Sequence, residues 1–194
     1  MKHLIVYSHP NPKSFNHAIL ETYTAALKHK GAEMRIRDLY TIGFSPALDV
    51  RDFDYYAQHK VPDEIQAEQD NIKWADFLTF IYPIWWTGLP AMVKGYIDRV
   101  FTNGFAFGVG ADGVKGLLPG KKVFIFNTTG TPDPVYKDNG MLKSLSQTSD
   151  AGIFEFCGME MAGHKYFAGV PYITDADRAA MLEEVKAIAE NNSR

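Results

Sequence analysis

The chain has 194 residues, of which 46% are hydrophobic and 22% charged, proportions typical of one soluble globular domain over residues 1–194. Its formal net charge of −3 offers no field to attract nucleic acid or an anionic membrane. No apolar run approaches the roughly 20 residues of a membrane helix, the start lacks a signal-peptide pattern, and the single Cys157 excludes an internal disulfide, so we expect a cytoplasmic protein.

Four segments have the hydrophobic pattern of β-strands. Residues 4–7, 77–82 and 123–126 are nearly continuous apolar runs, typical of strands buried on both faces, whereas residues 34–37 alternate and predict a more peripheral strand. Residues 15–27 and 92–100 repeat apolar side chains at helical spacing, and a further amphipathic helix begins after Thr174. Strands that alternate with helices predict an α/β fold with a parallel sheet and helices on both faces.

Three stretches have the least regular sequence, and two of them follow strand or helix ends, where doubly wound sheets place their ligands. Residues 41–62, 104–120 and 129–140 are rich in Gly, Pro, Asp or Asn and are expected to be irregular. Cys157 is interpreted as a buried packing residue. The remaining candidates are read as solvent-facing or packing residues without metal-ligand spacing or paired-carboxylate logic, and no metal site is expected; they are His3, His17, His29, His59 and His164, and the acidic loop residues Asp52, Asp54, Asp63 and Glu64.

The first stretch that could carry chemistry is residues 8–16, between the first strand and the first helix. Such a turn directs helix N–H groups and the positive end of the helix dipole toward one point, which suits a phosphate. Ser14 and Asn16 could add donors, and His9 could reach the same group. The stretch has neither a G-x-G-x-x-G nor a P-loop sequence. The equally supported alternative is that Ser14 caps the helix and His9 is an ordinary turn residue.

The second stretch is residues 82–90, which leave the third apolar run. Two prolines and a glycine stiffen this loop, and Trp85 and Trp86 stand at the carboxyl end of a strand, where a flat ring could stack. The alternative for the tryptophan pair is an anchor in a homodimer interface.

The third stretch is residues 127–136, after the last of these runs. The turn Thr128-Thr129-Gly130 exposes consecutive N–H groups that can bind an anion or a carbonyl, although in isolation an ordinary turn is the better interpretation. In a sheet of order 2-1-3-4-5 the three stretches would adjoin one another. A phosphate site beside an aromatic slot and an amide-lined edge matches the needs of flavin mononucleotide (FMN).

These residues resemble the flavodoxin-like NAD(P)H:quinone oxidoreductases, a family that includes mammalian DT-diaphorase and the flavoproteins that accompany bacterial potassium-efflux channels. The matching motifs follow in the same order from the first strand to the fourth and continue at Phe156-Cys157-Gly158. They are His9 with Ser14-Phe15-Asn16, Pro83-Ile84-Trp85-Trp86, Leu89-Pro90-Ala91, Lys94-Gly95, Asp98-Arg99-Val100-Phe101, Gly104-Phe105-Ala106-Phe107 and Thr128-Thr129-Gly130. The resemblance implies a flavodoxin-like, doubly wound, five-stranded parallel sheet of order 2-1-3-4-5.

The resemblance also implies a role for each site residue. The phosphate end of the flavin is held by His9, Phe15 and Asn16, beside which Ser14 is a further cofactor-binding candidate, and its ring lies along Pro83, Ile84, Trp85, Trp86 and Thr87. The N–H groups of Trp86 and Thr87 face the flavin O4 and N5, while the N1 and O2 edge meets Thr128, Thr129, Gly130, Thr131 and Tyr136. The catalytic candidates are Thr87, Gly130 and Tyr136.

In the family, the aromatic turn that matches residues 104–108 lies at a dimer interface. Trp86, Phe107 and Phe156 are therefore the substrate-binding candidates, the latter two reaching the flavin of a neighbouring subunit, and the resemblance implies a homodimer with a shared active site. Two positions depart from the pattern. Leu142 stands where relatives with a Tyr–His pair have the histidine, and Thr131 replaces a second glycine.

The function that the resemblance implies is hydride transfer from NADH or NADPH, through the flavin N5, to a quinone or similar flat acceptor in two alternating half-reactions. FMN is favoured over FAD because relatives that hold FAD have a longer loop before the third strand and a longer C-terminal tail. Two alternatives are a flavin-bearing regulatory subunit of a potassium-efflux channel and a one-electron flavodoxin. No nucleic acid partner and no membrane insertion is expected.

Overall fold

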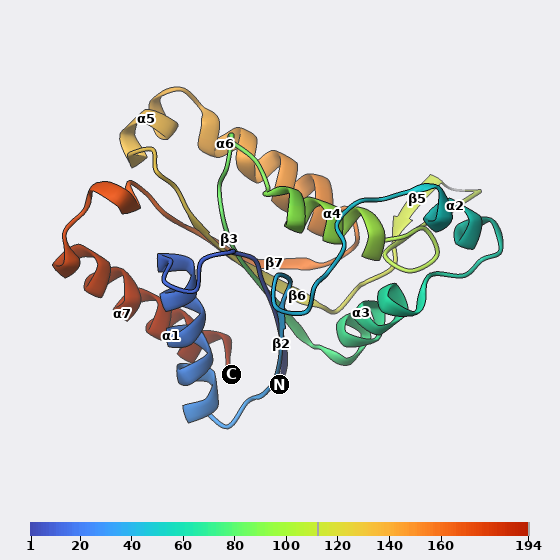
Figure 1. Ribbon diagram of the computed structural model, residues 1–194, viewed down its shortest axis with the longest axis horizontal. Coiled ribbons are helices and arrows are strands. Elements are labelled where there is room, and N and C mark those ends of the chain that lie inside the picture. The colour runs from blue at the N-terminus through green and yellow to red at the C-terminus, as the bar shows by residue number, and fades with distance from the viewer. Residues whose placement is uncertain (112, 194) are drawn as a thin grey trace.

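The core of the molecule is a parallel sheet with helices packed around it (Figure 1). Its five strands have the order β2-β1-β3-β6-β7, which confirms the predicted flavodoxin-like order. This computed structural model describes residues 1–111 and 113–193. The strands are β1 (Lys2–Tyr7), β2 (Glu33–Asp38), β3 (Phe77–Pro83), β6 (Lys122–Thr128) and β7 (Glu160–Phe167). Because all five run in one direction, the loops that leave β1, β3 and β6 start at the same edge of the sheet.

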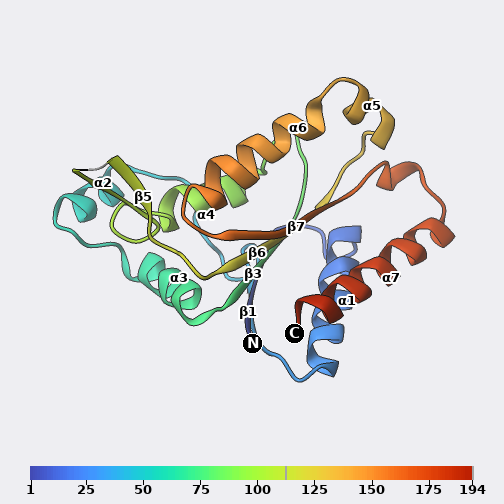
Figure 2. The ribbon, with the colours of Figure 1, turned by 180° about the vertical axis from the view of Figure 1, so that it is seen from behind.

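Helices cover both faces of the sheet (Figures 1 and 2). One face packs against α1 (Phe15–His29) and α7 (Asp175–Asn192). The other packs against α3 (Asp63–Trp74), α4 (Ala91–Val100), α6 (Met141–Ser146) and the π-helix η1 (Gln147–Glu155). Across the described ranges, no helix is both long and apolar enough to cross a membrane.

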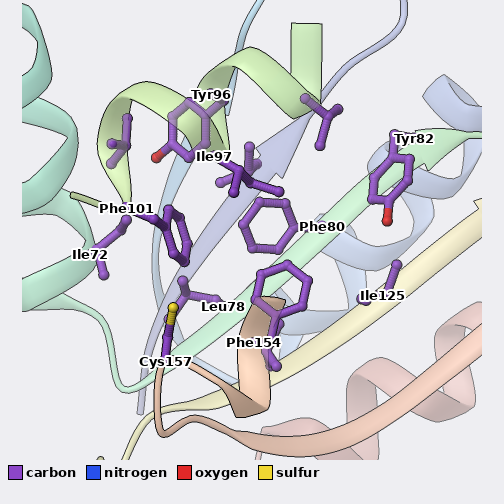
Figure 3. Close-up of a cluster of buried hydrophobic side chains, with 14 of the residues drawn as sticks. Ile72, Leu78, Phe80, Tyr82, Tyr96, Ile97, Phe101, Ile125, Phe154 and Cys157 are labelled. Carbon is purple, nitrogen blue, oxygen red and sulfur yellow. The ribbon is translucent and has the colours of Figure 1, made fainter. Parts of the chain in front are cut away.

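Alternate residues of the central strands enter opposite cores, which explains their continuous apolar sequence. In β3, Phe77 packs on the α1 side, whereas Phe80 packs on the α4 side, where its ring centroid lies 4.8 Å from that of Phe154. Figure 3 shows this second core, with Cys157 at its border. Cys157 is buried, as predicted, and burial raises the pKa of its thiol to about 11, so the thiolate is scarce at neutral pH.

Parts of the three stretches that were expected to be irregular form helices and strands, so the prediction was wrong for these segments. They contain α2 (Val50–Ala57), the hairpin of β4 (Phe107–Gly110) and β5 (Gly113–Gly116), and α5 (Asp133–Asp138). A 3₁₀ turn, η2 (Val170–Tyr172), follows β7.

The prediction that Asp52, Asp54, Asp63 and Glu64 form an acidic loop was also wrong, because they lie in α2 and α3. Asp52 is 1% exposed and accepts from Arg99 of α4 at 2.7 Å, and it completes a capping box with Asp49 at the start of α2. Asp63 and Glu64 open α3, where carboxylates favour the helix dipole. The partner of Asp52 lies far along the chain, so local composition could not reveal it.

Candidate functional site

A cavity of about 710 Å³ lies where the loops after β1, β3 and β6 meet at the carboxyl edge of the sheet. Its volume is within the roughly 300–1,000 Å³ of small-molecule sites. Every cofactor-binding candidate from the sequence lines it, namely His9, Ser14, Phe15, Asn16, Pro83, Ile84, Trp85, Trp86, Thr87, Thr128, Thr129, Gly130, Thr131 and Tyr136. The structure therefore brings the three predicted stretches together around one space.

The first wall of the cavity is the start of α1. Ser14 caps this helix, as its alternative interpretation predicted, and accepts from the N–H of His17 at 3.2 Å. Capping uses the acceptor side of the hydroxyl, so its O–H can still donate. Because α1 begins at Phe15, the N–H groups of Phe15 and Asn16 belong to a first turn that has no helical acceptor. A helix start of this kind provides several donors for an anion.

Asn16 joins this wall to the end of β6. Its side chain is 3% exposed, and its Nδ2 donates to Thr128 Oγ1 at 2.7 Å. Its Oδ1 is buried and has no hydrogen-bond partner within residues 1–111 and 113–193. A buried amide oxygen without a partner is unfavourable by about 1–3 kcal/mol, so a ligand that donates to it would be stabilised.

His9 presents a neutral donor to the same region. Its Nδ1 accepts from the N–H of Asn11 at 3.0 Å, as expected of a turn residue. Burial lowers the pKa of His9, so the ring is neutral at pH 7 and its proton resides on Nε2. The lining contains no Lys, Arg, Asp or Glu side chain, so an anion here would be held by neutral donors and the helix start.

The second wall is a tight turn with strained backbone. Trp85 and Gly88 exchange both backbone hydrogen bonds, at 3.2 and 3.1 Å, around the two central residues Trp86 and Thr87. These have φ of 50° and 55°, which is the geometry of a type I′ turn. Such turns normally contain Asn and Gly, because side chains, above all β-branched ones, disfavour this conformation.

The turn keeps polar groups available. No hydrogen bond in the described part of the chain engages the N–H of Trp86 or Thr87. Strained, unpaired groups of this kind concentrate at ligand sites. The Trp85 ring packs edge-on against His9 at 5.8 Å, whereas the Trp86 side chain is 97% exposed, so Trp86 is not part of the core.

The third wall, residues 128–131, is tied to the loop that follows β7. Thr129 donates its N–H to Phe167 O at 2.9 Å and accepts from the N–H of Val170 at 3.0 Å, while its Oγ1 donates to Thr131 O at 2.7 Å. A Cβ built on Gly130 would have Pro171 as its nearest neighbour, at 4.0 Å. No other part of the described chain therefore fills the space beside Gly130, and Gly130 lines the cavity. Tyr136 of α5 lines the same space and is buried.

Two substrate-binding candidates do not reach this cavity. Phe107 and Phe156 pack together, with ring centroids 5.5 Å apart, and line a separate pocket of about 270 Å³ with Phe101 and Cys157. Of the three substrate-binding candidates, only Trp86 lines the cavity of about 710 Å³ in its own chain.

Sequence reasoning missed two lining residues, Val170 and Pro171. They follow β7, whose sequence Glu160–Phe167 is too polar to stand out as an apolar run. Locating this strand would have drawn attention to the loop after it, by the same argument that identified the other three loops.

Comparison with known proteins agrees with the fold. A family model described as a flavodoxin-like fold matches residues 1–189. The chain is 38% identical over 184 residues to an uncharacterized NAD(P)H oxidoreductase of Haemophilus influenzae, covering 94% of this chain and 91% of that protein. It is 30% identical over 208 residues to NAD(P)H dehydrogenase [quinone] 1 of Cavia porcellus, covering 97% and 76% of the two chains.

A solved structure shows the same architecture. The NAD(P)H:quinone oxidoreductase of Methanothermobacter marburgensis superposes with a TM-score of 0.88 at 26% identity, covering 100% of this chain and 98% of that one. The chain belongs to the family with a flavodoxin-like fold, among oxidoreductases that include NAD(P)H dehydrogenases of quinones.

Proposed function

We propose that this protein is a flavin-dependent NAD(P)H oxidoreductase that reduces quinones or similar flat acceptors. The observation that carries the proposal is the convergence of three loops with unpaired polar groups on one cavity. The names of the relatives add support for the NAD(P)H and quinone substrates. The cofactor we propose is FMN, with FAD as the alternative.

The start of α1 would hold the phosphate end of the cofactor. First-turn N–H groups, the Ser14 hydroxyl and His9 Nε2 are all donors, and the dipole of α1 favours an anion at this place. The unpaired Oδ1 of Asn16 would accept from a hydroxyl of the chain that links phosphate and ring. These residues therefore fit the polar half of FMN.

The strained turn and residues 128–131 would hold the ring. A bound flavin would supply the redox chemistry, taking up a hydride from NAD(P)H and with it negative charge on the ring. The Trp86 and Thr87 N–H groups would direct the ring, and the Gly130 and Thr131 N–H groups would stabilise that charge. Fixed backbone donors need no reorganisation during the reaction. The Tyr136 hydroxyl would add a further donor beside them.

We also propose that two copies of the chain complete each site. Trp86 is 97% exposed and Phe156 is 46% exposed, so in one chain the mouth of the cavity and the Phe107–Phe156 pair both have uncovered aromatic surface. A partner subunit's Phe107 and Phe156 would then cover the slot in which nicotinamide and acceptor bind in turn. A cytoplasmic location stays a prediction.

Steady-state kinetics tests the proposed reaction. With the FMN-loaded protein, NADH or NADPH and a soluble benzoquinone, we expect parallel double-reciprocal lines, because one slot serves both substrates alternately. Intersecting lines would contradict the shared slot. A flavin-loaded protein without NAD(P)H oxidation would contradict the enzyme assignment and favour a regulatory subunit or a one-electron carrier.

A further inference from the structure

A partly buried hydrogen-bond chain that the candidate site does not use runs behind it, through Asp150, His164 and Asn127. Its first cause is a bulge in β7. Val123 of β6 pairs with Met161, but the next residue, Phe124, pairs with Gly163, so Ala162 is an extra residue. Bulges re-aim the side chains that follow them and are common beside active sites. Gly163 permits this one, because a Cβ there would lie 2.6 Å from the Phe124 ring.

The second cause is the π-helix η1, which covers this face of the sheet. Asp150 projects from it, and His164 Nδ1 lies 2.8 Å from Asp150 Oδ1. The other ring nitrogen, Nε2, lies 2.7 Å from Asn127 Oδ1. The imidazole is 7% exposed and stacks on Tyr166, with ring centroids 4.0 Å apart. π-helical turns occur often at functional positions.

The hydrogen-bond chemistry fixes the donor between His164 and Asn127. Asn127 Nδ2 donates to Tyr82 O at 2.9 Å and to Phe126 O at 3.1 Å, so its Oδ1 must be the atom that faces the imidazole. That oxygen can only accept, so His164 Nε2 must carry a proton and donate to it. The other ring nitrogen, Nδ1, faces the Asp150 carboxylate at 2.8 Å and the Tyr166 hydroxyl at 3.2 Å.

Asn127 connects this pair to the candidate site. It is fully buried, and its amide bridges β6 to the carbonyl of Tyr82 in β3. Each of these two residues immediately precedes a lining residue, Pro83 in β3 and Thr128 in β6. The orientation of the Asn127 side-chain amide thus sets the spacing between the ends of β3 and β6, where the second and third walls of the cavity begin.

We propose that His164 is a positioning residue: held by Asp150, it donates to Asn127 and so locks the ends of β3 and β6 in the spacing that flavin binding needs. The proposal rests on the proposed function for the identity of the ligand. The hydrogen-bond chain itself is independent of that function.

The proposal predicts that a donor at position 164, rather than an imidazole as such, is what the site needs. The groups in hydrogen-bond distance of the imidazole are Asp150 of η1, Tyr166 of β7 and Asn127 of β6. Ser149 donates to Asp150 at 2.6 Å, and the Ser146 hydroxyl lies 3.4 Å from that of Tyr166. A side chain that can donate to Asn127 Oδ1 should keep FMN affinity, and one that cannot should weaken it.

The test measures the FMN dissociation constant of the full chain by flavin fluorescence quenching. His164→Leu should bind about tenfold more weakly than the parent. His164→Gln, whose amide can donate to Asn127, should recover binding to within about threefold of the parent. The matched control is His29→Gln, at the exposed end of α1, which should behave as the parent.

A second readout does not involve the flavin. In the apoprotein, the side-chain amide protons of Asn127 should exchange slowly with solvent in the parent and in His164→Gln, and quickly in His164→Leu. Parent-like FMN binding in His164→Leu would overturn the proposal, as would equal amide exchange in the parent and both variants. If the parent does not bind FMN, the proposed function fails, while amide exchange still decides whether His164 locks Asn127. If His164→Leu does not fold, His164→Gln decides: fast exchange of the Asn127 amide or a loss of FMN affinity well beyond threefold in that variant would overturn the proposal.

Discussion

Thr87 is the clearest case of a residue whose conformation its own sequence disfavours. A β-branched side chain at φ 55° is strained by roughly 1–2 kcal/mol. Trp86 and Thr87 both have positive φ and both line the cavity. The strain is therefore best explained by the backbone N–H groups that this turn makes available to a ligand.

Thr87→Gly should relieve this strain without removing the N–H. Allowing for the extra freedom of glycine in the unfolded chain, we expect the free energy of unfolding of the apoprotein to rise by about 1 kcal/mol in urea titrations. FMN affinity should stay within about threefold. Thr131→Gly is the matched control, since Thr131 has no positive φ and its replacement should only destabilise. Equal destabilisation by both substitutions would contradict the argument.

Asn16 should be the most sensitive side chain of the phosphate wall. Asn16→Ala removes the bond to Thr128 and the polar group that has no partner in the apoprotein. We expect FMN affinity to fall by roughly 10- to 100-fold, equivalent to about 1–3 kcal/mol, in equilibrium titrations. Asn71→Ala, in α3 and outside the cavity lining, is the control and should leave the affinity unchanged. A yellow Asn16→Ala protein with parental affinity would remove Asn16 from the site.

His3 should make stability depend on pH. Its ring is fully buried against Phe77, and neither nitrogen has a hydrogen-bond partner in the described chain. Burial lowers its pKa from 6.5 to about 4. Between these values the unfolded chain binds a proton that the folded chain does not, so the free energy of unfolding should fall by about 2 kcal/mol from pH 6.5 to 4.

His3→Leu should remove most of this fall in the free energy of unfolding between pH 6.5 and 4, while keeping an apolar contact with Phe77. Urea unfolding from pH 7.5 to 4 measures it, with His29→Leu as the exposed control. An unchanged pH slope in His3→Leu would contradict the assignment to His3.

At the scale of elements, α2 depends on a buried ion pair rather than on an apolar face. Arg99 donates to Asp52 at 2.7 Å, to Glu64 at 3.0 Å and to the carbonyl of Ser45 at 2.9 Å. The Arg99 and Asp52 side chains are 6% and 2% exposed, whereas that of Glu64 is 60% exposed. A buried charge that loses its partner is much less favourable than an exposed one.

Asp52→Ala should therefore lower the free energy of unfolding by roughly 3–5 kcal/mol, against roughly 0–1 kcal/mol for Glu64→Ala. Chemical denaturation of both variants measures the difference. Hydrogen exchange should also show earlier opening of α2 in Asp52→Ala. Similar small losses in the two variants would mean that the ion pair does not hold α2.

Elements with strong local patterns could be predicted, and those fixed by distant partners could not. The strands around Phe80 and Ile125 are continuous apolar runs, and Ser14 and Thr174 are recognisable caps. By contrast, α2 is held by Arg99 of α4, and β7 is recognisable as a strand only by its pairing with β6. The Asp150–His164–Asn127 chain needed a bulge and a π-helix, neither of which has a sequence signal here.

At the scale of the whole molecule, the site could be predicted because parallel strands place their following loops together. Each loop alone had an ordinary alternative, and one of these, the cap at Ser14, is confirmed. Convergence on one cavity is a property of the sheet order and not of any single loop. The left-handed conformation of Trp86 and Thr87, in contrast, could not be predicted. It results from the hydrogen bonds that close the turn between Trp85 and Gly88, and the conformational preferences of Trp and Thr disfavour it.

The central claim is that this cavity holds a flavin, and the visible absorption spectrum of the purified protein tests it most directly. We expect a yellow protein that carries about one flavin per chain, identified as FMN by the mass of the compound released on heating. A protein that is colourless, and that stays colourless after incubation with FMN or FAD followed by gel filtration, would contradict the account.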